Sequence, residues 1–273
     1  MTRYQPKQFE DRHIAVLDLE ALSGEQPEDG SFPPWPTFTP ILASVLQADR
    51  NSYGEWSFSL ETVRFFEDDE PFEQVDELIR ARGLITFNGA GFDLPVLMLS
   101  AQKARCFQLP ALTAAATQPK FGNVHYDLAQ RCSNYGAVRG GTLEQLCSAL
   151  SIPAKFDMHG DQVGELYDNG EIDRIEAYCG SDVAATLMLY AHQRAMEIGD
   201  PLYHASLITQ FARWAMQDGR ECLRPFTQVR QLDQLLPISL RGQIAAAEQV
   251  AGVNAEWRDK RALDASFGEA VRY

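Results

Sequence analysis

The chain has 273 residues, a hydrophobic fraction of 45%, and a formal net charge of -14 at pH 7 from 38 acidic and 24 basic residues. This length allows one large domain, or one domain with an extension, and enough apolar residues to bury a full core. The negative net charge argues against a protein that binds long duplex DNA by charge alone, because such proteins need a basic face.

Apolar runs in the sequence fall short of the length of a membrane span, and the N-terminal residues lack the apolar stretch of a secretory signal. The cysteines lack close paired spacing, which indicates reduced thiols rather than a disulfide framework or a zinc site. We therefore expect a cytoplasmic protein that makes no contact with a membrane.

The first part of the chain predicts three strands. An apolar, β-branched run over residues 13–19 predicts a buried strand. Residues 24–40 are rich in Pro, Gly and acidic side chains and predict a loop. Residues 40–48 and 55–63 predict two further strands, and the turn residues at 51–54 favour antiparallel pairing between them.

Alternating elements follow. Apolar residues at helical spacing predict a helix over residues 71–82, with Gly83 as its stop. A strand over 84–87, a helix over 94–103 and a short strand over 124–129 that ends at Asp127 come next. This mixed order predicts an α/β fold in which helices cover a mixed sheet.

Later segments are helical. Thr142 and Gln145 form a capping-box pattern at the start of a helix, and residues 171–195 predict one or two helices. After residue 200 the pattern stays helical, with breaks expected near Gly219, Pro225 and Pro237. We expect a domain over residues 1–200 and a helical C-terminal extension over residues 201–273.

The first group of chemically interesting residues closes the first predicted strand. Side chains two apart on a strand point to the same face, so Asp18 and Glu20 can reach one metal site together. Charged groups at the end of a buried strand are costly unless cations or solvent receive them. The alternative is an exposed strand end with two solvated carboxylates.

A glycine-rich turn carries the second group. Gly89 and Gly91 allow a sharp turn between Asn88 and Asp93, and Asn88 can hydrogen-bond to hold it. Asp93 also fits a helix N-cap, which is the alternative to a metal ligand. Asp127, at the end of the next predicted strand, is a candidate supporting carboxylate.

The third group lies on a predicted helix. Tyr178 and Asp182 are four residues apart and therefore share a face. Taken alone, this pair is more typical of a tyrosine at the edge of the core beside a surface aspartate.

Together these residues resemble the DEDD superfamily of 3′→5′ exonucleases, which have a ribonuclease-H-like fold. The resemblance covers roughly residues 10–195. Asp18 with Glu20, Asn88 with Phe92 and Asp93, and Tyr178 with Asp182 match its three motifs in order. Position 177, where the histidine subclass has His, is Ala, so the chain resembles the tyrosine subclass, and most of all stand-alone exonucleases related to family-B DNA polymerase proofreading domains.

The resemblance implies a two-metal mechanism with Mg²⁺ or Mn²⁺. One ion would be bound by Asp18, Glu20 and Asp182, and the other by Asp18 with Asp93. Tyr178 would orient the attacking water, and a nucleoside 5′-monophosphate would leave from a 3′ end. By the same resemblance, three residues would contact nucleic acid: Leu19 through its backbone, Asn88 and Phe92. The basic side chain of Lys155 is a further candidate, for contact with a phosphate.

The implied partners are single-stranded 3′ ends and a polymerase or a replication or repair protein in trans. Two alternatives stay open from the sequence. An RNA-directed exoribonuclease would use the same chemistry, because discrimination of the 2′-hydroxyl depends on loop contacts. A non-catalytic module that binds nucleic acid or a partner could keep the fold without the activity.

Overall fold

The centre of the molecule is a five-stranded sheet of order β3-β2-β1-β4-β5. The computed structural model describes residues 9–25, 27–29, 31–153, 160–228 and 232–270, with side chains described as far as residue 252, except at 161. The first three strands are antiparallel, whereas β4 and β5 run parallel to β1. This is the ribonuclease-H-like mixed sheet that was predicted. The strands are β1 His13–Ser23, β2 Phe38–Arg50, β3 Trp56–Arg64, β4 Gly83–Thr86 and β5 His125–Asp127.

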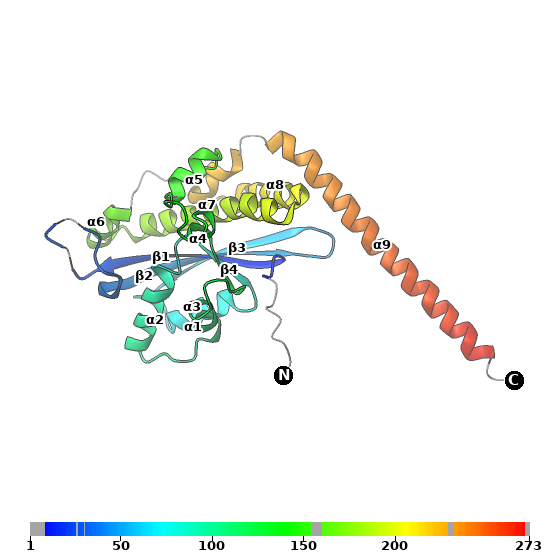
Figure 1. Ribbon diagram of the computed structural model, residues 1–273, viewed down its shortest axis with the longest axis horizontal. Helices are drawn as coiled ribbons and strands as arrows, with labels where there is room; N and C mark the ends of the chain where they lie inside the picture. The colour runs from blue at the N-terminus through cyan, green and yellow to red at the C-terminus, as the bar shows by residue number, and fades with distance from the viewer. Residues whose placement is uncertain (1–8, 26, 30, 154–159, 229–231, 271–273) are drawn as a thin grey trace.

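Helices cover both faces of the sheet (Figure 1). Because β1 is covered on both sides, Ile14, Ala15, Val16 and Leu17 are all buried, which explains the uninterrupted apolar run. On one side lie α1 Pro71–Ile79, α2 Asp93–Lys103 and α3 Pro110–Ala116; on the other lie α4 Leu128–Cys132, α5 Leu143–Ala149, α6 Val163–Asp168, α7 Ile172–Ile198 and α8 Pro201–Asp218.

Several local predictions are confirmed. β2 and β3 pair antiparallel. Thr142 accepts a hydrogen bond from the Gln145 backbone while the Gln145 side chain accepts one from the Thr142 backbone, so the capping box at α5 is complete. Residues 172–198 form a single helix, which ends at Gly199 in the left-handed conformation.

The role predicted for Gly83 is wrong. Helix α1 ends at Ile79, and Gly83 is instead the first residue of β4. A Cβ atom at Gly83 would lie 2.5 Å from the ring of Phe9, so glycine is needed there for close packing. Ala81, with a φ of 60°, already turns the chain out of the helix.

The first helix of the C-terminal part, α8, packs into the core. Tyr203, Leu207 and Phe211 of α8 are buried in the same cluster as residues of the sheet and of α7. The short helix η3 Glu221–Gln228 follows, and α9 Leu232–Ala270 then extends away from the body (Figure 1). The division at residue 200 stays a prediction.

The break expected at Pro237 is wrong, because α9 continues through this residue. Pro237 is close to the start of the helix, where it removes one early backbone hydrogen bond and leaves the later turns intact. Within the described residues, no helix combines the length and the apolar character needed to cross a membrane.

Candidate active site

The first pair of carboxylates lies where β1 extends beyond its parallel neighbour. Pairing with β4 is limited to residues 14–16 of β1, so Asp18 and Glu20 face a site that β4 leaves open. The pairing with β2 shifts register between Glu20 and Ala21. The residue without a partner in this ladder, Ile41, is on β2, and such a bulge opposite Glu20 increases the local twist and is common next to active sites. Asp18 is half-buried and Glu20 is 8% exposed.

The turn between β4 and α2 has room only for glycine at its tightest point. A Cβ atom at Gly89 would lie 2.4 Å from Oγ1 of Thr86, which instead accepts a hydrogen bond from the Gly89 N–H over 3.0 Å. Asn88 has a φ of 66°, in the left-handed region that asparagine tolerates. This geometry places Asp93 at the first position of α2, where it is buried.

Asp127 holds this turn from the neighbouring strand. Its Oδ1 accepts the N–H of Asn88 over 3.1 Å, and its Oδ2 accepts the N–H of Ala90 over 3.0 Å. It also accepts the N–H of Gln130 and so caps α4. The side chain therefore anchors the segment that carries Asp93.

The alternative of Asp93 as a helix N-cap is wrong. The capping residue of α2 is Phe92, and no side chain makes the cap hydrogen bond. The carboxyl of Asp93 instead lies close to the backbone N–H of Leu19, which favours its charged form. Asp93 is thereby directed toward the end of β1.

Helix α7 brings the third group to the same place. Tyr178 and Asp182 share a face, and their side chains lie close to each other. Between them Cys179, fully buried, directs its thiol at Asp18: the Sγ atom lies 3.3 Å from Oδ2 and 3.5 Å from the backbone carbonyl oxygen. Sequence reasoning missed this contact, although Cys179 is next to Tyr178 in the third motif.

The four carboxyl groups interact strongly. Burial, reinforced by repulsion from Asp93, raises the pKa of Asp18 to about 7. Burial also raises the pKa of Asp93 to about 7, and burial with repulsion from Asp18 raises the pKa of Asp182 to about 8. The pKa of Glu20 is raised well above its usual value by burial and then by the three aspartates. Each group thus resists ionisation beside the others.

A bound cation would offset this repulsion, and the donor set fits one. Ligand atoms of Asp18, Glu20 and Cys179 all lie within 4.8 Å of one another. The sulfur of Cys179 is a soft ligand, but the four carboxyl groups supply the hard oxygen ligands that favour Mg²⁺ or Mn²⁺. The charge of two divalent ions would match that of four carboxylates.

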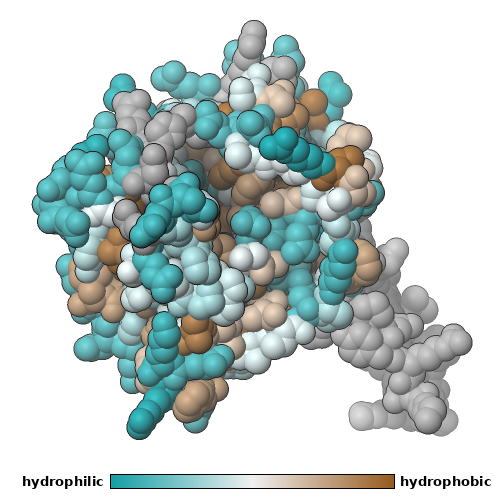
Figure 2. All heavy atoms as spheres, turned by 60° about the vertical axis from the view of Figure 1, so that its left-hand side comes forward, coloured by the Kyte–Doolittle hydropathy of each residue, from teal (hydrophilic) through white to brown (hydrophobic). Residues whose placement is uncertain are grey.

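The residues expected to contact nucleic acid differ in accessibility. Asn88 is exposed, whereas Leu19 has a buried side chain and offers its backbone alone. Phe92 is half-buried, with its ring edge-on to Phe38 at 4.9 Å and to the exposed Phe32 at 5.9 Å. Lys155 lies outside the described residues. The end of the molecule at which β1 finishes is hollowed and bordered by both hydrophilic and hydrophobic residues (Figure 2).

Residues 69–228, more than half of the chain, match a family described as a predicted 3′-5′ exonuclease related to the exonuclease domain of PolB. The chain belongs to this family. The matched region contains Asp93, Tyr178 and Asp182, while Asp18 and Glu20 lie before it and are brought to them by the fold.

Two solved structures are similar to the chain at low identity. The family-B DNA polymerase of the hyperthermophilic archaeon Pyrobaculum calidifontis has 16% identity and a TM-score of 0.45, over 84% of this chain and 28% of the polymerase. An ExoI/SSB-Ct complex has 15% identity and a TM-score of 0.41, over 77% of this chain and 46% of the other. The chain thus spans less than half of either structure that it matches.

Proposed function

We propose that this protein is a divalent-metal-dependent 3′→5′ exonuclease that hydrolyses phosphodiester bonds at single-stranded 3′ ends, with DNA as the favoured substrate. One observation carries the proposal: Asp18, Glu20, Asp93 and Asp182, from three distant segments, bring their carboxyl groups together beside the hydroxyl of Tyr178. Membership of an exonuclease family supports it. The product is a nucleoside 5′-monophosphate.

The four carboxylates would hold two Mg²⁺ or Mn²⁺ ions. Such ions, when bound, stabilise the charge on the attacking and leaving oxygens of an in-line displacement at phosphorus. The protein positions the carboxylates by three separate means: the part of β1 that extends beyond β4, the glycine turn anchored by Asp127, and the face of α7. Isolated buried carboxylates would be costly, and cations remove this cost.

Tyr178 has the role of orienting the water that attacks phosphorus. Burial, followed by the nearby Asp182, Glu20 and Asp18, raises the pKa of Tyr178 above its usual value, so the hydroxyl keeps its proton. A protonated hydroxyl that lies beside Asp182 can hold a water molecule in line with the scissile bond. It does not serve as the base at neutral pH.

Digestion of labelled oligonucleotides tests the proposal. Single-stranded DNA and RNA, labelled at either end, are incubated with Mg²⁺, Mn²⁺ or EDTA and with the wild type, Asp18→Asn or Asp182→Asn. We expect stepwise loss from the 3′ end of DNA with either metal, none with EDTA, and at least a 1,000-fold slower reaction in both variants, on the order of the contribution of a bound metal.

Circular dichroism shows whether each variant keeps its fold. Unchanged hydrolysis in both folded variants would overturn the proposal, as would cleavage that begins at the 5′ end. Faster digestion of RNA than of DNA would overturn the preference for DNA and leave the chemistry in place.

A further inference from the structure

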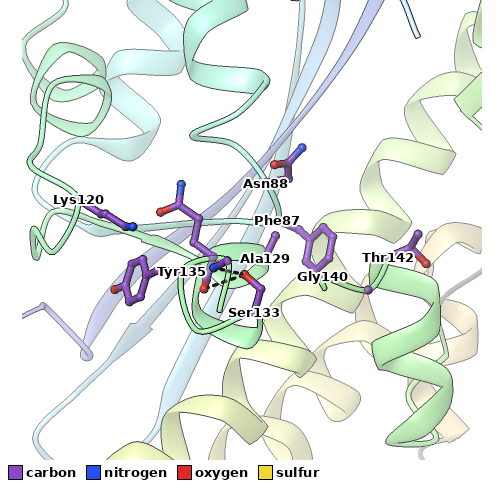
Figure 3. Close-up of a pocket in the computed structure, with 11 residues that line it drawn as sticks. Phe87, Asn88, Lys120, Ala129, Ser133, Tyr135, Gly140 and Thr142 are labelled. Atoms are coloured by element: carbon purple, nitrogen blue, oxygen red, sulfur yellow. Dashed lines mark hydrogen bonds between the residues drawn. The ribbon is translucent and has the colours of Figure 1, made fainter. Parts of the chain in front are cut away.

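A cavity of about 900 Å³ lies directly beside the second motif (Figure 3). It lies between the turn at the end of β4 and the segment that joins α4 to α5. Phe87, Gln130 and Gly141 form part of its wall. Asn88 belongs both to this cavity and to the turn that carries Asp93, so the cavity adjoins the carboxylate site.

The charge of the cavity contrasts with that of the whole protein. Its eleven described lining residues include one charged side chain, Lys120, and no carboxylate. The chain as a whole has 38 acidic residues against 24 basic ones. An anionic ligand therefore meets less repulsion here than at the carboxylate site next to it.

Aromatic rings lie close to the ammonium group of Lys120. The ring of Tyr135 lies 4.7 Å from that of Phe121, which is 70% exposed. The Nζ atom of Lys120 is 5.7 Å and 5.8 Å from the centres of these two rings, and the guanidinium of Arg131 is 5.8 Å from the centre of Tyr135. Basic groups interleaved with rings are the usual composition of surfaces that bind single-stranded nucleic acid.

The backbone that presents Tyr135 is strained. Asn134 and Tyr135 have φ values of 48° and 54°, followed by Gly136 at 88°. A bulky aromatic residue in the left-handed region is uncommon, and such strain gathers at functional sites. Asn88 on the opposite wall also has a positive φ. Two residues of distant segments with positive φ, Asn88 and Tyr135, thus line one cavity.

We propose that this cavity binds the nucleotides on the 5′ side of the scissile bond, with Lys120 on a backbone phosphate and Tyr135 against a base. The inference rests on the proposed function, since a strand whose 3′ end lies at the carboxylates must leave the site past a neighbouring surface. The cavity has the volume for at least one nucleotide. Binding in the cavity should make a longer single strand a better substrate than a single nucleotide unit.

The test compares two substrates. The p-nitrophenyl ester of thymidine 5′-monophosphate is too short to reach the cavity, whereas an oligothymidylate of eight nucleotides fills it. Lys120→Glu and Tyr135→Asn are assayed in the full chain; asparagine tolerates the left-handed backbone, so the second change removes the ring without adding strain. Lys103→Glu and Tyr53→Asn, at exposed positions outside the cavity, are the matched controls.

We expect the ratio of kcat/KM for the octamer to kcat/KM for the ester to fall at least fivefold in Lys120→Glu and Tyr135→Asn, the lower end of what one stacked base contributes. The two controls keep the wild-type ratio. Loss of one phosphate contact should also reduce the slope of log Kd against log salt by about 0.7 in Lys120→Glu. An unchanged ratio in both cavity variants would overturn the inference.

Failure of the proposed function gives a different result. If the wild type hydrolyses neither substrate, fluorescence anisotropy of the labelled octamer in the presence of Ca²⁺ tests binding at the cavity independently of catalysis. Weaker binding by Lys120→Glu and Tyr135→Asn than by their controls supports the inference without catalysis. Equal binding by all four variants overturns it.

Discussion

The thiol of Cys179 donates a hydrogen bond to Oδ2 of Asp18 over 3.3 Å, and in this way α7 restrains the first carboxylate of β1. The same sulfur lies 3.5 Å from the backbone carbonyl oxygen of Asp18, so it contacts both the side chain and the main chain of that residue. A metal ligand that is held by a second group binds its ion in one orientation.

Replacement of Cys179 should therefore weaken metal binding. We expect Cys179→Ala to raise the Mn²⁺ concentration for half-maximal activity about tenfold, the lower end of the effect of losing a residue that orients a ligand. Cys179→Ser keeps a hydrogen-bond donor and should raise this Mn²⁺ concentration less. Stabilisation of the protein by Mn²⁺, measured by thermal unfolding, should show the same order. Equal Mn²⁺ dependence in all three proteins would contradict the prediction.

The turn at Gly89 should not accept a side chain. In Gly89→Ala the new Cβ would meet Thr86 at 2.4 Å, so the turn or β4 must move. We expect the free energy of unfolding to fall by about 1–3 kcal/mol, the usual range for overpacking, as measured by urea denaturation. Gly24→Ala is the control, since its nearest neighbour would be 3.8 Å away. A similar stability of the two variants would show that the turn has more room than the structure indicates.

Asp127 should matter for stability and for activity. Asp127→Ala leaves the N–H groups of Asn88 and Ala90 without their acceptor, at a cost of about 1.5–3 kcal/mol in unfolding free energy for hydrogen bonds to a charged group. Asp127→Asn keeps one acceptor oxygen and should lose less. Because the turn carries Asp93, kcat should decrease in the same order. A full kcat in folded Asp127→Ala would show that the turn holds its shape unaided.

The metal-free protein should lose stability as pH rises. The folded state keeps protons on Asp18 and Asp93 up to a pKa of about 7, and on Asp182 up to about 8, whereas the unfolded chain releases them near pH 4. The folded state therefore binds more protons than the unfolded state across this window, and its free energy of unfolding falls with rising pH. His125 and His204, whose pKa values burial lowers to about 4, act in the opposite sense below about pH 6.5.

The effect of the carboxyl groups on stability is therefore free of the opposing histidine effect between about pH 6.5 and 8. With EDTA present, we expect Tm to decrease across this interval, and Mg²⁺ or Mn²⁺ to reverse the decrease at pH 8. Asp93→Asn removes one of the titrating groups and should flatten the profile. A Tm that rises toward pH 8 in EDTA would contradict the prediction.

Local patterns allowed much of this fold to be predicted. The apolar run of β1, the capping box at Thr142 and the spacing of Tyr178 and Asp182 each depend on near neighbours in the chain. Helix α3 was missed for the opposite reason: the backbone N–H groups of Ala111 and Leu112 at its start are accepted by the buried Asp76, 35 and 36 residues away. No nearby residue signals such a cap.

The same limit applies to the candidate site. The motif carboxylates were predicted because the three motifs occur together and in order, and resemble those of a known family. Cys179 and the cavity around Lys120 were not, since their roles arise where strands, turns and helices distant in sequence meet. The β-bulge of β2 opposite Glu20 is a further example, because register depends on the partner strand.

The last prediction concerns the hydroxyl of Tyr178. Tyr178→Phe keeps the ring and its packing but removes the hydroxyl that lies beside Asp182 and would orient water. We expect kcat to fall about 100-fold, the lower end of the effect of a positioned proton donor or acceptor, with little change in the stabilisation by Mn²⁺. Tyr167→Phe on α6 is the matched control, because the ring of Tyr167 packs against Phe66 and lies outside the carboxylate group. Loss of Mn²⁺ stabilisation in Tyr178→Phe would instead assign the hydroxyl to the support of Asp182 as a ligand.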